Sequence, residues 1–494
     1  MPSDGPQKRR FETTAAESTK SSTGRVILVT GTAGFVGYHC AKFFKKRGDG
    51  VLGLDNFNPY YPVGIKYDRA QDLEDSGVYT IKADLNDRSM LDHILQEYKV
   101  THVLALAAQA GVRYATKDPA SYVASNVAGF VQLLEACRFC DPQPRIVYAS
   151  SSSVYGLNTV SPFSESHQVD KPASLYAATK KANEMIAHTY HHIYGLSMTG
   201  LRFFTVYGPW GRPDMFAFSA TIKIHKGEAL KIFQGPGGSE LERDFTYIDD
   251  IVQGCVASVD RIPASTKETA HFKVYNLGNK DPVTVTYMIE CLERAIGKKA
   301  IKNYVPMPPT GDVLKTSADV SLAEKELDYK PTTSLQDGIN KFIAWYDAYY
   351  KDGLTKEMAS YVFIRVPAMF DYRRLMAIFS IPKTVFVANR PLCCPPGPAE
   401  GKAGVSYKRL SGILDGRFDL SPVLDFGSLD RFMTSETPLA VAAAQRLLQR
   451  KGGVLEPLKS PYEYYARAAL LQVRARRAAE EMIDLQPKKD ADVW

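Results

Sequence analysis

The sequence lacks any apolar run long enough to cross a membrane. A membrane-spanning helix needs roughly 18–20 apolar residues, and no stretch of this chain is that long. Residues 1–24 are polar and have no apolar core of a secretory signal. We therefore expect no membrane span, and we expect residues 1–24 to be a disordered leader.

Cysteine is scarce and irregularly placed. The seven cysteines are an odd number without the spacing of a disulfide framework. Cys137 and Cys140 have the spacing of a redox pair, but they end an apolar helical pattern, which favours buried structural thiols. Scarce cysteines without a disulfide framework are typical of proteins in a reducing compartment. We also expect no metal site.

A basic nucleic-acid footprint is missing from most of the chain. The net charge of +7 lies almost entirely in residues 351–494, which hold 22 Lys and Arg against 16 Asp and Glu. Residues 1–350 are close to neutral, so we expect no nucleic-acid partner. At 494 residues the chain is too long for one ordinary core, and we expect more than one domain.

Three spaced glycines follow the first apolar run. Val26–Thr30 is apolar or β-branched, and Gly31, Gly34 and Gly37 come after it. The pattern predicts a buried strand that turns into a helix at a dinucleotide site. The first glycine allows the turn, the second lets the backbone approach a pyrophosphate, and the third lets the helix pack on the strand. The alternative is a tight turn without a ligand.

Strands and helices then alternate. The predicted strands are 26–30, 51–54, 78–82, 102–106, 145–149 and 197–203, and the predicted helices are 35–47, 90–98, 122–138 and 175–194. This alternation predicts an α/β, Rossmann-type doubly wound parallel sheet. Glycine and proline cluster after residue 205, as in loops that close over a ligand. We expect an NAD-binding domain at 25–204, a smaller substrate-binding subdomain at 205–350 with segments that return to the sheet, and a mostly helical extension at 351–494.

Asp55 ends the second predicted strand, 18 residues after Gly37. A carboxylate at this place accepts hydrogen bonds from an adenosine ribose and repels a 2′-phosphate. The sequence therefore favours NAD over NADP, and the alternative is an aspartate that caps a loop.

Tyr176 and Lys180 lie four residues apart on a predicted helix, so they share one helix face. A nearby cation favours the phenolate, and we expect Lys180 to bring Tyr176 towards a working base. A serine run, Ser150–Ser153, ends the strand predicted upstream. One of its hydroxyls can hydrogen-bond the reacting oxygen. Tyr-x-x-x-Lys alone is also common on ordinary helix surfaces.

Taken together, these motifs resemble extended short-chain dehydrogenases/reductases, and most closely the UDP-glucuronate 4-epimerases. The resemblance covers about residues 25–350, and its most specific stretches are 54–61, 107–113, 148–157, 174–184, 201–215, 243–251 and 311–313. It implies a tightly held NAD contacted by Gly31, Gly34, Phe35, Val36, Gly37, Asp55, Asn56, Asp84, Leu85, Leu106, Ala107, Ala108, Asn126, Tyr176 and Lys180.

The resemblance also implies a reaction. Tyr176 would remove the proton of the sugar 4-hydroxyl, with a hydrogen bond from Ser151, and Lys180 would bind the nicotinamide ribose. The sugar would pass through a 4-keto intermediate, rotate in the site and be reduced on its other face. NAD is regenerated in each turn, so the protein has no reason to release it.

Further residues would hold the UDP-sugar. The implied substrate contacts are Arg113, Ser151, Ser152, Ser153, Thr205, Arg212, Lys231, Phe233 and Arg243. Arg243 matches the diphosphate ligand, and Thr205 and Arg212 match the carboxylate end of the pocket. Each arginine has an alternative role in a surface or interdomain ion pair.

Related activities differ at single positions. A dehydratase usually has an Asp-Glu pair beside the catalytic hydroxyl, and a UDP-glucuronate decarboxylase is expected to have Glu where Ser153 stands. A UDP-galactose-type epimerase usually has Asn in place of Thr205. These rivals are disfavoured, and the alternative from another class is a non-enzymatic NAD-binding scaffold.

The resemblance does not extend to residues 351–494. Plant members of the family are typically anchored in the Golgi, and the missing anchor leads us to expect a cytoplasmic protein. Family analogy also predicts a homodimer through the helices near 122–138 and 175–194. The extension itself could be a small domain, a docking module or a read-through.

Overall fold

A seven-stranded parallel sheet forms the centre of the computed structural model, which describes residues 6–265, 270–308 and 313–350. The strand order is β11-β6-β5-β4-β1-β2-β3. The strands are β1 Val26–Thr30, β2 Gly50–Asp55, β3 Tyr79–Lys82, β4 His102–Ala105, β5 Arg145–Ser151, β6 Met198–Phe203 and β11 Phe272–Leu277. The chain winds outward from β1 on one side and then from β4 on the other, so the predicted doubly wound fold is confirmed.

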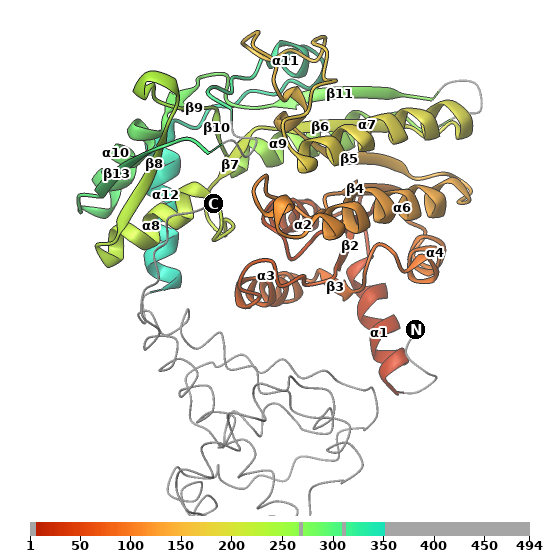
Figure 1. Cartoon of the computed structure of the whole chain (residues 1–494). Helices are drawn as coiled ribbons and strands as arrows, with labels where there is room; N and C mark the ends of the chain where they lie inside the picture. The colour runs from red at the N-terminus through yellow and green to blue at the C-terminus, as the bar shows by residue number, and fades with distance from the viewer. Residues whose placement is uncertain (1–5, 266–269, 309–312, 351–494) are drawn as a thin grey trace, which may run out of the picture. The chain divides into compact units, whose positions relative to one another are not determined.

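Helices cover both faces of the sheet (Figure 1). In that view α9, α2 and α3 descend along one side of the strands, and α7, α6 and α4 descend along the other. Their bounds are α2 Phe35–Arg47, α3 Gly64–Asp75, α4 Arg88–Glu97, α6 Gly129–Arg138, α7 Leu175–Tyr194 and α9 Ile248–Arg261. Ile27 and Val29 of β1 pack towards one layer and Leu28 towards the other, as a strand buried on both faces requires.

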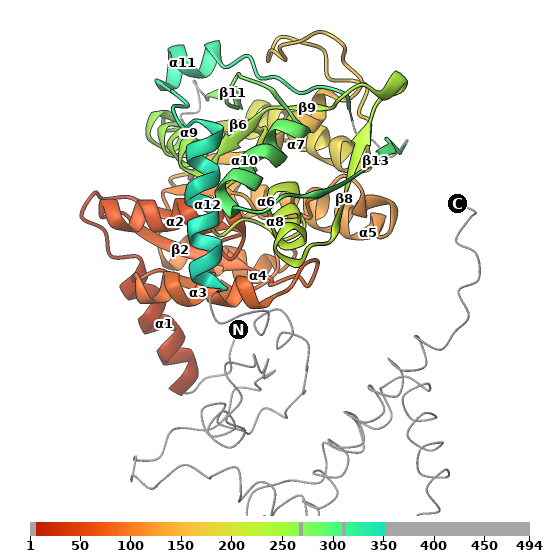
Figure 2. The ribbon, with the colours of Figure 1, turned by 90° about the vertical axis from the view of Figure 1, so that its left-hand side faces the viewer.

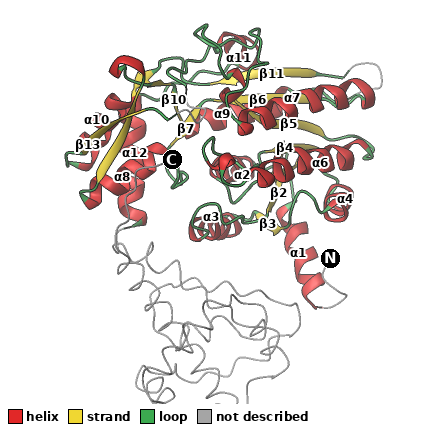
Figure 3. Cartoon of the chain, viewed as in Figure 1, coloured by secondary structure: helices red, strands yellow, loops and turns green. Residues whose placement is uncertain are grey.

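Within residues 25–204, two helical segments differ from the sequence prediction, and Figure 3 labels one of them, α3, among the helices. Residues 122–138 do not form one helix, because α5 (Pro119–Tyr122) passes into a π-helical turn, η2 (Val123–Ala128), before α6 begins. In addition, α3 was not predicted at all. Its buried face contains Lys66 and Arg69, and these cations interrupt the apolar period by which a helix is recognised.

The prediction of a disordered leader over residues 1–24 does not hold for Pro6–Ser18, which form helix α1, and residues 1–5 lie outside the described residues. Ala15 is fully buried against the sheet edge. The Ser18 hydroxyl accepts the N–H of Tyr79 on β3 at 2.8 Å and donates to a carbonyl of β2. A buried side chain and a hydroxyl that bridges two strands hold the helix in place, and neither was visible in a polar sequence.

The residues after β6 build a smaller lobe (Figure 2). It contains three short strand pairs and three helices. They are β7 Thr205–Tyr207 with β10 Phe245–Tyr247, β8 Ala229–Gln234 with β13 Ile301–Pro306, β9 Glu242–Arg243 with β12 Val283–Thr284, and α8 Phe216–Lys226, α10 Val285–Ile296 and α12 Leu335–Tyr349. Helix α11 (Ser321–Leu327) packs instead on β11 and α9. Strand β11 and helix α9 return to the large sheet, as expected for segments of residues 205–350.

The predicted extension over residues 351–494 lies outside the described residues, as do Gly311 and Asp312 of one diagnostic stretch. Within the described ranges no helix combines the length and the apolarity that a membrane span requires.

Candidate active site

A cleft lies across the carboxyl ends of the central strands. It encloses about 1730 Å³ of space, its solvent-open mouth included. Ligands of doubly wound sheets bind at this edge. The predicted site residues that line the cleft are Gly31, Gly34, Phe35, Val36, Gly37, Asp55, Asn56, Asp84, Leu85, Leu106, Ala107, Ala108, Ser151, Ser152, Ser153, Tyr176, Lys180, Thr205 and Arg212.

The glycine turn between β1 and α2 is packed too closely for side chains. Gly31 has φ +77°, and a Cβ there would lie 2.9 Å from the backbone nitrogen of Ala107. A Cβ on Gly37 would lie 2.1 Å from the carbonyl oxygen of Gly31. No side chain caps α2 at Gly34, and the first turn of the helix lines the cleft. The N–H groups and the positive dipole end of α2 are therefore available to an anion.

Asp55 closes one end of the cleft at the end of β2. Its carboxylate accepts the backbone N–H of Phe57 at 2.8 Å and that of Ala33 at 3.1 Å. Burial raises the pKa of Asp55, and the positive charge of Lys66 opposes the rise. Lys66 also lines the cleft. Sequence reasoning missed it because it belongs to the helix that was not predicted.

Ser151, Tyr176 and Lys180 all line the cleft. Ser151 Oγ accepts the backbone N–H of Ser153 at 3.1 Å, which leaves its hydroxyl proton free to point at the Tyr176 oxygen. Lys180 is 4 % exposed, and its Nζ donates to the carbonyl of Ala149 at 2.8 Å. The strand end and helix α7 thus bring a hydroxyl, a phenol and an ammonium together.

The pKa of Tyr176 reflects three influences. Burial raises it, while the hydrogen bond with Ser151 and the positive charge of Arg212 lower it. The sequence analysis assigned this electrostatic help to Lys180. The part assigned to Lys180 in lowering the pKa of Tyr176 stays a prediction. Lys180 is itself affected by its surroundings, since burial lowers the pKa of its ammonium to about 8.

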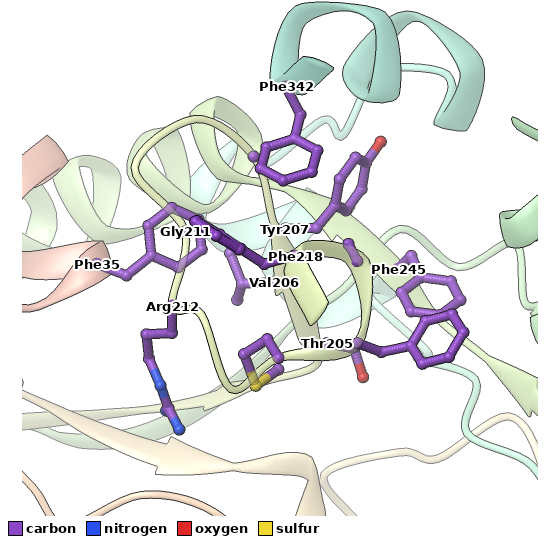
Figure 4. A pocket seen from close by; sticks show the side chains of 13 residues that line it. Phe35, Thr205, Val206, Tyr207, Gly211, Arg212, Phe218, Phe245 and Phe342 are labelled. Atoms are coloured by element: carbon purple, nitrogen blue, oxygen red, sulfur yellow. The ribbon is translucent and has the colours of Figure 1, made fainter. Parts of the chain in front are cut away.

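Arg212 enters the cleft from the segment between β7 and α8. Its guanidinium forms a two-point ion pair with Asp214, with Nε–Oδ1 at 3.1 Å and Nη2–Oδ2 at 2.6 Å. The hydroxyl of Tyr60 donates to the same carboxylate at 3.0 Å. Figure 4 shows Arg212 extending away from the aromatic rings of Phe218 and Phe342, which fill the space behind this segment.

Asp214 and Tyr60 were not predicted as site residues. Burial alone would raise the pKa of Asp214, but its ion pair with Arg212 outweighs burial and holds that pKa below the usual range. The guanidinium of Arg212 is therefore paired with a carboxylate in the cleft. Both residues lie in stretches on which the family resemblance rests, and no spacing in the sequence revealed the contact between them.

Asn126, predicted as a cofactor contact, does not line the cleft. It is 2 % exposed in the π-helical turn. Its side chain accepts the N–H of Gln109 at 2.7 Å and donates to the carbonyl of the same residue at 3.0 Å. It also donates to the Thr179 hydroxyl at 3.0 Å. The structure therefore gives Asn126 a place in fixing the loop after β4 against helix α7.

Four predicted substrate residues also lie outside the cleft lining. Lys231 and Phe233 are on β8, and Arg243 is on β9 of the smaller lobe. The guanidinium of Arg113 lies 4.6 Å from the centre of the Phe233 ring. Arg243 Nη1 donates to the carbonyls of Glu242 and Leu314 at 2.8 and 3.1 Å. The contact between Arg113 and the Phe233 ring thus joins a loop of the large domain to the smaller lobe.

The fold and this site define an extended short-chain dehydrogenase/reductase. The sequence matches the GDP-mannose 4,6 dehydratase family over residues 28–342. It is 54 % identical over 359 residues to UDP-glucuronate 4-epimerase 2 of Arabidopsis thaliana, a match that covers 72 % of this chain and 82 % of that protein. Protein CapI of Staphylococcus aureus is 46 % identical over 336 residues, which is 66 % of this chain and 99 % of CapI.

A solved structure shows the same similarity. The UDP-glucuronic acid 4-epimerase of Bacillus cereus, crystallised with UDP-glucuronic acid and NAD, is 36 % identical with a TM-score of 0.60. The match covers 66 % of this chain and all of that chain, 100 %. The chain therefore belongs to this dehydratase and epimerase family, on the branch of the UDP-glucuronate 4-epimerases.

The cleft fits NAD on its own geometry. The uncapped α2 terminus suits a pyrophosphate, and the glycines let the turn pack closely against the Ala107 backbone and its own helix. Asp55 lines the same cleft at the end of β2, where the sequence predicts the ribose contact. The expected cofactor is thus supported by the chain's own residues as well as by its relatives.

We predict that Gly37→Ala weakens NAD binding. The added Cβ would meet the Gly31 carbonyl at 2.1 Å, so the turn has to shift from the conformation that holds the cofactor, and relieving such overpacking costs about 1–3 kcal/mol of stability. The measurement is the NAD content of the purified protein after gel filtration. Gly64→Ala is the matched control, because nothing lies within 4 Å of a Cβ there. Equal NAD content in the two variants would contradict the role given to the turn.

Proposed function

We propose that the chain catalyses NAD-dependent 4-epimerisation of a UDP-sugar, and that it converts UDP-glucuronate to UDP-galacturonate. One observation carries the proposal. Tyr176, the base, and Arg212, a cation suited to an acidic sugar, line the same cleft as the glycine turn that fits a dinucleotide. A redox site and a carboxylate site in one cavity are what 4-epimerisation of a uronate needs.

Tyr176 moves the proton of the sugar 4-hydroxyl. Bound NAD supplies the reversible oxidation and reduction at C4. The Ser151 hydroxyl stabilises the Tyr176 phenolate by donating a hydrogen bond to it. Lys180, fixed by the Ala149 carbonyl, stands one helical turn further along to orient the cofactor ribose. Because one phenol serves both faces of C4, the 4-keto sugar has to turn over in the cleft between the two half-reactions.

The sugar carboxylate has to be held still while C4 is a ketone. A β-keto acid loses CO2 readily, so donors around the carboxylate favour epimerisation over decarboxylation. We assign this restraint to Arg212, Thr205, Ser152 and Ser153, all of which line the cleft. A serine at position 153, where a decarboxylase is expected to have Glu, also leaves no carboxylate there to repel the substrate.

The nucleotide end of the substrate would reach the smaller lobe. We assign the diphosphate to Arg243 and the uridine to Lys231 and Phe233, with Arg113 at the junction. The support is their clustering on β8, on β9 and beside the Phe233 ring. On this assignment residues 205–350 recognise the substrate, and residues 25–204 hold the cofactor and the catalytic groups.

We further propose a homodimer in the cytoplasm. Large apolar side chains stay exposed on α7 and on the turn before α6, with Val123 at 50 %, Met185 at 62 % and Ile193 at 59 % exposed. Exposed apolar surface of this kind favours association. The five cysteines in the described part of the chain are all free thiols, which agrees with a reducing compartment.

The direct test incubates the purified protein with UDP-glucuronate and no added NAD. We expect UDP-galacturonate without CO2 or UDP-pentose, followed by NMR or chromatography. Tyr176→Phe should lower kcat by about 10²- to 10⁴-fold, because it removes the general base. Tyr194→Phe, which alters an exposed tyrosine of the same helix, is the control. Formation of UDP-pentose by the wild-type protein, or an active Tyr176→Phe variant, would contradict the proposal.

The Ser151 hydrogen bond should also appear in the pH dependence of kcat. It lowers the pKa of Tyr176, so Ser151→Ala raises that pKa and moves the acidic limb of the profile to higher pH. A hydrogen bond to a charged group contributes about 1.5–3 kcal/mol, so kcat should fall by roughly ten- to a hundredfold.

Ser152→Ala is the matched control for the pH profile. Ser152 lines the same cleft, and no influence of it on the pKa of Tyr176 is resolved. Its acidic limb should stay in place. If Ser151→Ala left the limb unmoved, the hydroxyl would not be a partner of the phenolate.

A further inference from the structure

Arg69 of α3 lies between the two loops that frame the cleft. Its side chain is completely buried, at 0 % exposed. Nη1 donates to the carbonyl of Ala33 in the glycine turn at 2.8 Å. Nη2 donates to the carbonyls of Trp210 and Gly211 at 2.6 and 3.1 Å. One guanidinium therefore touches both the dinucleotide loop and the loop that carries Arg212.

The positive charge of Arg69 is fully buried, and burial is unfavourable for a charged group. Among the described residues its hydrogen bonds go to three carbonyls and to the hydroxyl of Tyr61 at 3.0 Å, and no ion pair with a carboxylate is formed there. Burying a charge is expensive unless strong partners surround it. A guanidinium can reach acceptors in several directions at once, which lysine cannot. The geometry therefore gives a reason for arginine at this position.

The loop that Arg69 holds is strained. Trp210 has φ +59°, a conformation that a bulky side chain rarely adopts without outside support. His39 of α2 supports the same loop, since its Nε2 donates to the carbonyl of Pro209 at 2.9 Å. The Trp210 ring packs on Tyr38 of α2 at 5.3 Å between ring centres. Two residues after this strained position the chain presents Arg212 to the cleft.

We propose that Arg69 is a positioning residue that couples the cofactor and substrate halves of the cleft. Arg69 couples the orientation of the Arg212 side chain to the conformation of the glycine turn. The Arg212 cation therefore faces the sugar carboxylate when the turn is in the conformation that holds the cofactor. The inference rests on the proposed function, because it takes NAD and a uronate as the two ligands. A coupling of this kind acts in both directions, so loss of Arg69 weakens the hold on both ligands.

Loss of the coupling also changes the product. If the carboxylate of the 4-keto sugar is no longer restrained, its bond to C5 breaks and CO2 leaves. The bonding electron pair stays on C5 and takes a proton from solvent. The reducing equivalents taken from C4 then return to C4, and the product is a UDP-pentose. The share of UDP-pentose therefore reports on how well Arg212 is held.

The test compares Arg69→Lys and Arg69→Met with Leu73→Ala. Leu73 lies one turn further along α3 and is fully buried at 0 % exposed, so its truncation loosens α3 without touching either loop. For each holoenzyme we would measure NAD content per subunit, KM and kcat for UDP-glucuronate, the UDP-pentose share and the unfolding temperature. We expect both Arg69 variants to raise KM about fivefold or more, to lose NAD and to form UDP-pentose, with the lysine variant less affected.

Leu73→Ala should lower the unfolding temperature but keep its NAD, its KM and a single product. If the Arg69 variants lose only thermal stability, or affect only one of the two ligands, the coupling is overturned while the proposed function stands. If the wild-type protein does not convert UDP-glucuronate, the proposed function itself is overturned.

Discussion

The close approach of the Gly31 turn to the strand beside it and to its own helix is the constraint on which the cleft depends. The space that side chains would need at Gly31 and Gly37 is already filled by the backbone of Ala107 and by the Gly31 carbonyl. Because this packing leaves the α2 terminus uncapped at the strand ends, a dinucleotide can bind backbone groups directly. The other strands then add Asp55, Ser151 and the Tyr176 helix around the same edge.

Neighbouring polar and charged groups influence the pKa of the Tyr176 phenol in the cleft. A buried phenol resists ionisation, so Tyr176 needs help to act as a base. In this cleft the help comes from the Ser151 hydroxyl and from Arg212. Arg212 is in turn paired with Asp214, which moderates its charge. The same cation is thus suited to two tasks, the hold on an acidic sugar and support for the phenolate beside it.

Much of the fold could be read from the sequence because its elements follow simple periods. The predicted helices 35–47 and 175–194 coincide with α2 and α7, and each begins at a glycine turn or a serine cap. Helix α3 was not predicted because cations interrupt the apolar pattern of its buried face. The π-helical turn around Asn126 was not predicted because an apolar pattern does not distinguish a continuous α-helix from one that contains a π-helical turn.

The site was predicted where its residues are close along the chain or match a family motif, as with Tyr176 and Lys180. Contacts between distant segments were not predictable in this way. The bonds from Arg69 to Ala33 and to Trp210 span 36 and 141 residues, and only the folded chain brings them together. For the same reason the sequence did not reveal that Arg212, which comes from another element, also lowers the pKa of Tyr176.

The central claim is that C4 of the sugar is oxidised and re-reduced inside one cleft without exchange with solvent. The most direct measurement uses UDP-glucuronate that carries deuterium at C4, incubated with the protein in ordinary water. The account predicts that UDP-galacturonate forms with the label still on C4, seen by mass spectrometry and by NMR. Epimerised product that has lost its deuterium to solvent would contradict it.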